Sequence, residues 1–255
     1  MNVRLLFLLI LIAAGAKAQE NIPELITDRP DQTESAEVVP LNALQIETGF
    51  VVFNDKTNQV QHTSYAYNST LLRYGILPNF ELRLGLEYLG DKTEISSNSI
   101  SGFGPLYTGF KVKISDEQKG MPAIAILGAL TLPFTANEEY KPSEPAANMR
   151  LSISHTLSDR ISLGYNLGAE WDGETPTPGY FYSIALGIGI SDKIGVFAES
   201  FGLLGANDKE EHLLDAGVTY LLLPNLQVDI SGGIGLSENA ADSFVGAGLS
   251  FRLPQ

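Results

Sequence analysis

The 255-residue sequence contains no cysteine and has a formal net charge of −14 at pH 7. Without cysteine the chain has no disulfide framework, no thiolate metal site and no lipid-modified N-terminal cysteine. Such an acidic chain is also unsuited to nucleic acid, because binding the phosphate backbone requires a basic face.

The first 18 residues are typical of a cleaved secretory signal peptide. Arg4 supplies a positive charge ahead of an apolar run at residues 5–15, and the sequence AKA at residues 16–18 has the small-x-small pattern of a cleavage site. The apolar run is short for a helix that stays in the membrane. We therefore expect residues 1–18 to direct export and to be removed, which takes away two positive charges, Arg4 and Lys17, and leaves the mature chain at −16.

Residues 19–42 are polar, acidic and interrupted by proline, and no periodic pattern runs through them. We expect an extended N-terminal segment here, which lies in the periplasm or inserts into the lumen of the fold that follows.

From residue 43 to residue 255 the dominant period is two, the period of a β-strand. The stretch FELRLGLEY at residues 80–88 is the clearest case, with large apolar residues on one face and Glu, Arg and Gly on the other. The pattern is least clear at residues 123–132, where both faces are apolar. Twelve strands are predicted, at residues 44–52, a strand ending with 70–76, 80–88, 106–114, 123–132, 149–157, 161–171, 180–190, 194–201, 214–221, 226–236 and 244–253.

The connections between these strands alternate in length. Short turns such as LPN at residues 77–79 and again at 223–225 follow the even-numbered strands, and longer acidic loops follow the odd-numbered ones. Short turns at one end and long loops at the other are the signature of an outer-membrane barrel. An even number of strands places both termini at the short-turn, periplasmic end.

The composition of the two strand faces distinguishes lipid from water as the outer environment. A soluble β-sandwich needs a solvated outer face rich in Lys, Glu and Thr, whereas here the polar face is mostly Gly, Ser, Ala and Asn. The other face is Leu, Ile, Val, Phe and Tyr with almost no charge, as expected if a charge facing lipid costs about 2–4 kcal/mol. The predicted fold class is all-β, a closed antiparallel up-and-down transmembrane β-barrel of about 12 strands, with a soluble all-β protein as the alternative.

Four stretches carry a resemblance to a known family. They are ITDRPDQTESAEVVPLNALQIETGF, LLRYGILPNFELRLGLEY, DAGVTYLLLPNLQVDISGGIGLS and FVGAGLSFRLP, spread over residues 26–254. Together they resemble the family named for a meta-pathway of phenol degradation, whose members are exported bacterial proteins often described as transporters. The resemblance implies an outer-membrane β-barrel and the passage of small molecules, including hydrophobic or aromatic compounds.

Charged side chains recur on the small, polar face of the strands, which would point into the barrel. Two interpretations of these residues stay open. They line a pore or binding cavity and set its electric field, or they form a paired network that fills a narrow interior. The residues are Glu47, Arg73, Glu81, Arg83, Glu87, Lys111, Lys113, Arg150, Glu170, Glu199, Asp215, Asp229 and Arg252.

The stretch TDRPDQTES, at residues 27–35, is a candidate plug or gate. Its charged residues are Asp28, Arg29, Asp31 and Glu34, and Arg29 would reach a carboxylate in the lumen. The alternative is a periplasmic tether that leads into the first strand. The acidic residues lack the spacing and central glycine of a calcium loop, so no metal site is expected.

The sequence does not indicate an enzyme. A hydrolase of this fold needs a nucleophile and a base within reach of each other, and the three histidines are His62, His155 and His212. His155 has the lipid-facing parity, whereas Ser152 and Ser154 have the opposite parity, so no local pair forms.

The predicted function is therefore passive, cofactor-free passage of small molecules through an outer-membrane barrel. The expected partners are outer-membrane lipid and a small-molecule substrate, and no nucleic acid. The alternative is a closed structural or adhesion-type barrel whose acidic external loops bind a partner.

Overall fold

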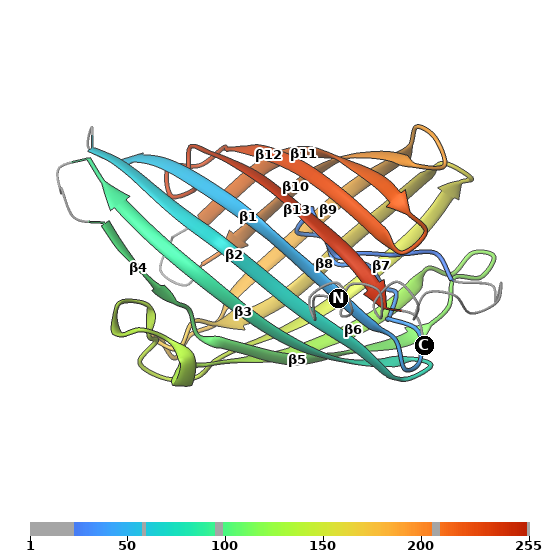
Figure 1. Cartoon of the computed structure of the whole chain (residues 1–255), viewed down its shortest axis with the longest axis horizontal. Helices are drawn as coiled ribbons and strands as arrows, with labels where there is room; N and C mark the ends of the chain where they lie inside the picture. The colour runs from blue at the N-terminus through green and yellow to red at the C-terminus, as the bar shows by residue number, and fades with distance from the viewer. Residues whose placement is uncertain (1–22, 58–59, 95–98, 206–209, 254–255) are drawn as a thin grey trace, which may run out of the picture.

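Thirteen antiparallel strands follow one another around a closed sheet in the computed structural model, which describes residues 23–57, 60–94, 99–205 and 210–253 (Figure 1). The predicted signal peptide lies outside the described residues. The strands are β1 (Leu44–Thr57), β2 (Val60–Leu77), β3 (Phe80–Thr93), β4 (Ser99–Phe103), β5 (Leu106–Ser115), β6 (Ala123–Leu132), β7 (Ala146–Ser158), β8 (Ile161–Trp171), β9 (Gly179–Gly189), β10 (Ile194–Leu204), β11 (Glu210–Leu223), β12 (Leu226–Gly235) and β13 (Ser243–Leu253).

The barrel closes because β1 pairs with β2 on one side and with β13 on the other. Closure satisfies the backbone hydrogen-bonding groups of the outermost strands, which an open sheet in lipid would leave without partners. Two short 3-10 helices, η1 (Pro133–Thr135) and η2 (Glu138–Tyr140), lie in the connection between β6 and β7. No helix within the described ranges is long and apolar enough to cross a membrane.

The barrel wall has twelve strand positions, because β4 and β5 share one of them. The first half of β3 pairs with β5, and the second half pairs with β4. Gly104 and Pro105 separate the two pieces, and a proline has no N–H group with which to continue the ladder. The predicted twelve-stranded barrel is thus confirmed with one extra strand, β4, which the sequence pattern did not reveal because SISGF is only five residues long.

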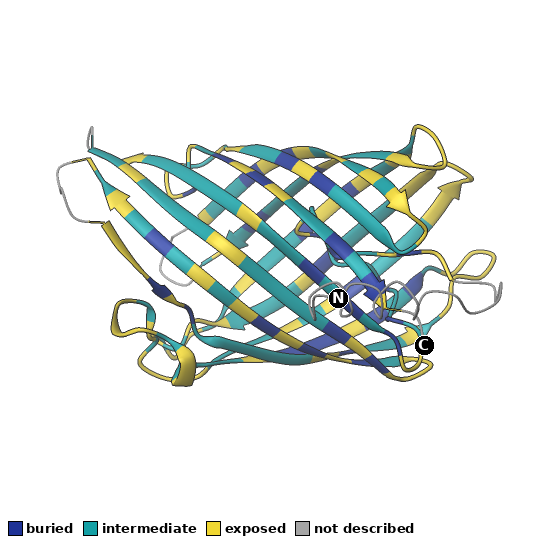
Figure 2. Ribbon diagram, in the orientation of Figure 1, coloured by how far each residue is buried: buried dark blue, intermediate teal, exposed yellow. Residues whose placement is uncertain are grey.

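Burial is inverted relative to a soluble protein, as the alternation of colours along the strands shows (Figure 2). On β3 the side chains of Leu82, Leu84 and Leu86 are 45%, 39% and 41% exposed, whereas Glu81 and Arg83 are 0% and 2% exposed. A water-facing exterior would reverse these values. The apolar face therefore faces lipid, and the charged face lines the interior.

The two ends of the barrel differ in their connections. Two-residue turns join β2 to β3, β7 to β8 and β11 to β12, whereas the connection from β6 to β7 contains both 3-10 helices. Leu44 pairs with Leu253, so β1 begins and β13 ends at the end that carries the short turns. We call the two ends of the barrel the short-turn end and the long-loop end.

A charge on the lipid face should destabilise the barrel. For Leu84→Arg we expect a loss of about 2–4 kcal/mol in the free energy of unfolding, because the guanidinium would face hydrocarbon. Leu84→Ala is the matched control and should cost less. The measurement is urea unfolding of the protein refolded into lipid vesicles, followed by the fluorescence of Trp171, the single tryptophan. Equal losses for the two variants would contradict the assignment of this face to lipid.

Candidate functional site

The segment that precedes β1 lies inside the barrel, toward the short-turn end (Figure 1). We call residues 25–40 the lumen segment. Its residues Leu25, Ala36 and Val39 are buried. Its backbone N–H groups donate to side chains of the wall, including Val39 N to Glu81 Oε2 at 2.7 Å and Gln32 N to Glu199 Oε2 at 2.8 Å. An irregular backbone at membrane depth needs such partners, because no lipid group can replace them.

The centre of the site is the carboxylate of Asp28. It lies 2.9 Å from Arg73 Nη1, 3.2 Å from Arg83 Nη2 and 2.8 Å from Lys111 Nζ. These cations project from β2, β3 and β5, and all four side chains are buried. Charges removed from water are stable only when paired and hydrogen-bonded, so the three strands and the lumen segment depend on one another here.

Arg73 extends this network along the wall. Its guanidinium makes a two-point contact with Glu81, at 2.8 and 3.0 Å, and a further contact with Glu47 Oε1 at 2.8 Å. Glu47 also accepts a hydrogen bond from the backbone N–H of Asp28, at 3.1 Å. Arg73 therefore keeps two carboxylate partners from the wall itself in addition to the one from the lumen segment.

Two further carboxylates of the lumen segment, Glu34 and Glu37, pair with basic side chains of the wall. The Glu34 carboxylate pairs with Arg83 and lies 3.3 Å from Lys111 Nζ, and Glu37 lies 2.7 Å from Lys113 Nζ. Across the lumen, Asn166 of β8 holds the backbone of Glu34 by accepting from its N–H at 2.7 Å and donating to its carbonyl at 2.9 Å.

Arg29 points the other way, toward the acidic strands. Its Nη2 lies 2.9 Å from Asp229 Oδ1 on β12. The guanidinium passes over Gly49 and Gly248, which are paired in the β1–β13 ladder. A Cβ atom at either glycine would come within 2.5 Å of it. These two glycines therefore provide the space that the Arg29–Asp229 pair occupies.

The turn of the lumen segment contacts β9 and β10. Thr33 donates to Glu199 and lies 2.7 Å from Ser183 Oγ. Asp215 lies directly across the β10–β11 ladder from Glu199. Among the described residues, no cluster of His, Asp and Glu could hold a metal ion.

The thirteen wall residues singled out in the sequence all lie on the inner face, but the structure divides them. Nine of them form ion pairs or hydrogen bonds with the lumen segment: Glu47, Arg73, Glu81, Arg83, Lys111, Lys113, Arg150, Glu199 and Asp229. Arg252 donates to the carbonyls of Pro23 and Glu24. The contact of Arg150 is with the Gln32 carbonyl, and within the described ranges Glu87, Glu170 and Asp215 form no ion pair. Their role in passage stays a prediction.

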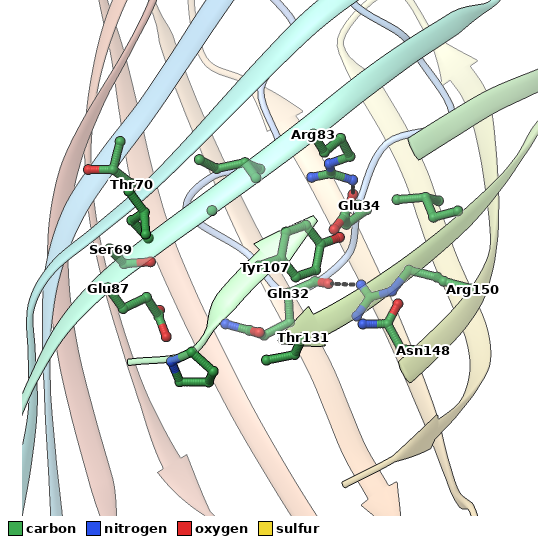
Figure 3. Close-up of a pocket in the computed structure, with 15 residues that line it drawn as sticks. Gln32, Glu34, Ser69, Thr70, Arg83, Glu87, Tyr107, Thr131, Asn148 and Arg150 are labelled. Carbon is green, nitrogen blue, oxygen red and sulfur yellow. Dashed lines mark hydrogen bonds and ion pairs between the residues drawn. The ribbon is translucent and has the colours of Figure 1, made fainter. Parts of the chain in front are cut away.

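Two cavities lie on opposite sides of the lumen segment. The cavity toward the long-loop end has a volume of about 400 Å³ and is lined by Gln32, Glu34, Tyr107 and Arg150 among others (Figure 3). The cavity toward the short-turn end has a volume of about 280 Å³ and includes Asp31 and Arg29 in its lining. The lumen segment therefore separates two internal spaces of a closed barrel.

Sequence reasoning missed a set of inward-facing apolar side chains near the long-loop end. Leu213, Ala240 and Phe244 form a buried cluster against which Val51, Phe53 and Phe201 pack. Phe201 has the same parity as Glu199, two residues earlier, so counting from the charged residue along each strand would have placed it inside.

The histidines pair with other side chains at the barrel surface and loops. His155 Nε2 lies 3.2 Å from Tyr165 Oη, and His212 Nδ1 lies 3.0 Å from Tyr182 Oη. His62 Nδ1 lies 3.4 Å from Thr93 Oγ1.

The closed sheet, the apolar exterior and the charged interior define an outer-membrane β-barrel. Many solved structures share the fold, and three of them are the following. The COG4313 outer membrane channel from Pseudomonas putida F1 has a TM-score of 0.73 at 12% identity, covering 86% of this chain and 98% of that one. The KdgM porin has a TM-score of 0.53 at 10% identity, covering 81% and 98%. The translocator domain of the autotransporter NalP from Neisseria meningitidis has a TM-score of 0.52 at 12% identity, covering 84% and 90%.

The model of the family described as "Putative MetA-pathway of phenol degradation" matches residues 27–253, and the chain belongs to that family. This confirms the resemblance seen in the sequence. None of the curated protein sequences matches the chain. The structurally similar proteins are a channel, a porin and a translocator domain rather than enzymes.

Removal of the Asp28 charge should loosen the lumen segment. For Asp28→Asn we expect a loss of about 3 kcal/mol or more in the free energy of unfolding, because Lys111 and Arg83 lose a buried counter-charge. Asp192→Asn, in an exposed turn, is the matched control and should have little effect. Urea unfolding in lipid vesicles measures both, and equal stability of the two variants would contradict the central role of Asp28.

A side chain at Gly248 should displace Arg29. We expect Gly248→Ala to cost about 2 kcal/mol, because Asp229 is then left without its charged partner. Gly189→Ala is the control, since a Cβ atom there meets nothing closer than 3.8 Å. The cost of Gly248→Ala should disappear in an Arg29→Ala background, as a double-mutant cycle of unfolding free energies would show. A cost that persists there would assign the effect to the strand itself.

Proposed function

We propose that the protein is a passive channel for small hydrophobic molecules across the outer membrane, and that its lumen segment is the gate. The observation that carries the proposal is the pair of cavities, about 400 and 280 Å³, that the lumen segment separates within one closed barrel. A molecule that enters from the long-loop end reaches the first cavity and then meets this segment.

The side chains of the lumen are suited to binding a hydrophobic substrate. The apolar cluster around Phe53, Phe201 and Phe244 lies at the long-loop end of the lumen, ahead of the polar contacts of the lumen segment. Apolar side chains with a few placed polar groups are typical of sites that bind small organic molecules. The family description, with its reference to phenol degradation, agrees with an aromatic or similar compound.

The contacts of the lumen segment are suited to a reversible gate. Arg73 retains Glu47 and Glu81 of the wall when the segment moves, so its charge does not become isolated. Arg83 and Lys111 lose Asp28 and Glu34 and gain water instead. The ion pairs stabilise the closed position of the segment. When the segment moves, hydration of the freed charges replaces these ion pairs, so the free energy cost of opening stays moderate.

A closed structural barrel is the second candidate, and the extent of the same contacts favours it. The lumen segment binds side chains of strands from β1 round to β12, as a permanent filling of the interior would.

A reversible cross-link distinguishes the two candidates. The chain has no cysteine, and the Oγ atoms of Thr33 and Ser183 are 2.7 Å apart, so Thr33→Cys combined with Ser183→Cys should form a disulfide between the lumen segment and β9. We expect the oxidised protein to be silent in planar-bilayer conductance and the reduced protein to show the single-channel steps of the unmodified protein. The two single cysteine variants are the controls.

Two outcomes would contradict the proposal. A well-folded, unmodified protein that never conducts would support the closed structural barrel. Equal conductance before and after reduction, with the disulfide verified by mass spectrometry, would show that the lumen segment is not the gate.

A further inference from the structure

The cavity toward the long-loop end contains a guanidinium group without a carboxylate partner, that of Arg150. Resting on the proposed function, we propose that Arg150 binds the carboxylate of a small hydrophobic acid, aromatic or aliphatic, and that this contact weakens the hold on the lumen segment. The substrate class is thereby narrowed from small hydrophobic molecules in general to those that carry a negative group.

Arg150 differs from the other arginines of the network in its partners. Arg73 and Arg83 each pair with carboxylates, whereas Arg150 donates from Nη1 to the Gln32 carbonyl at 2.7 Å and to Asn166 Oδ1 at 3.0 Å. In the described part of the chain, no carboxylate lies within ion-pair distance of it. A guanidinium presents five N–H donors in a planar fork that matches a carboxylate, so Arg150 retains donors for a ligand.

The surroundings of Arg150 fit an acid with an apolar body. The guanidinium carbon lies 4.6 Å from the centre of the Phe181 ring, which holds it in place by a cation–π contact. Asn148 and Tyr107 line the same cavity and supply further polar groups, while Leu71 and Leu127 supply apolar surface. The volume of about 400 Å³ falls within the roughly 300–1,000 Å³ range of small-molecule sites.

The carboxylates around the cavity determine which end of a ligand approaches Arg150. Glu87 lies on the opposite side of the cavity from Arg150, next to Ser69 (Figure 3). Glu34 is occupied by Arg83 and Lys111. Glu170, on β8, lies across the ladder from Asn148 and does not line the cavity. A negative group is therefore repelled from the Glu87 side and attracted to the Arg150 side, with the apolar body between them.

A ligand at Arg150 is coupled to the gate through Gln32. Nη1 of Arg150 donates to the carbonyl of this lumen-segment residue and to Asn166, which leaves the hydrogens of Nη2 and Nε of the same guanidinium for the ligand. A carboxylate that draws the guanidinium away competes with that hydrogen bond. By thermodynamic linkage, loosening of the lumen segment in turn frees Arg150 and tightens binding of the acid.

Calorimetric titration of the full mature protein in detergent tests the site. The probes are benzoate and octanoate, with benzamide and octanamide as neutral counterparts and benzylamine as a cation. We expect the acids to bind at least about tenfold more tightly than the amides, because a charge-assisted, two-point contact is roughly twice as strong as a neutral one. Arg150→Gln should abolish that preference, and Arg150→Lys should keep part of it.

Two further variants make the test specific. Arg160→Gln changes an exposed arginine at a short turn and should leave the preference for acids intact. Glu87→Gln removes the opposing charge and should tighten acid binding about twofold. Folding of each variant is checked by heat-modifiable gel mobility.

The proposal is overturned if benzoate and benzamide bind equally, if Arg150→Gln retains the preference, or if benzylamine binds in place of the acids. Passage of neutral toluene and of benzoate into proteoliposomes is measured separately. Passage of toluene without a preference for acids overturns this inference and leaves the channel intact. Tight, Arg150-dependent acid binding without any passage supports the site and overturns the channel.

Discussion

The interaction on which the rest of the interior depends is the contact of the Asp28 carboxylate with Arg73, Arg83 and Lys111. A barrel that faces lipid on the outside must place its charges inside, and three neighbouring strands here present buried cations to the same point. Buried like charges repel and require a counter-charge. The lumen segment supplies it, and the position of that segment then determines the cavities on either side.

The charges of the lumen segment are opposite in sign to those of the wall on both sides. Glu34 and Asp28 face the basic strands, and Arg29 faces Asp229 on the acidic side through the space left by two glycines. Because the contacts are ionic and polar, hydrogen bonds to water could replace them if the segment moved. An apolar plug that moved in the same way would expose apolar surface to water. In the proposed channel, the polar contacts would hold the lumen segment in place, and the apolar cluster nearer the long-loop end would receive the hydrophobic substrate.

Most of the fold could be predicted from the sequence, and the site only in part. The period of two, the uncharged apolar faces and the alternating turn lengths predicted a twelve-position barrel, because each is a local consequence of crossing lipid. β4 was missed because five residues carry too little periodicity. The inner face was identified by its small and polar composition, so the large apolar residues Phe201 and Phe244 were not assigned to it. Counting in steps of two from neighbouring charged residues assigns them to the inner face.

The sequence by itself determined which side of the wall each charge occupies, since alternation along a strand assigns every residue to one face. It also marked TDRPDQTES as a candidate to enter the barrel. Only the tertiary structure decided that Asp28 meets three cations, that Arg29 meets Asp229 and that Arg150 is left without a carboxylate. The reason is physical: such pairs join residues up to 200 positions apart, and closure of the barrel and the course of the lumen segment across it determine which of them meet.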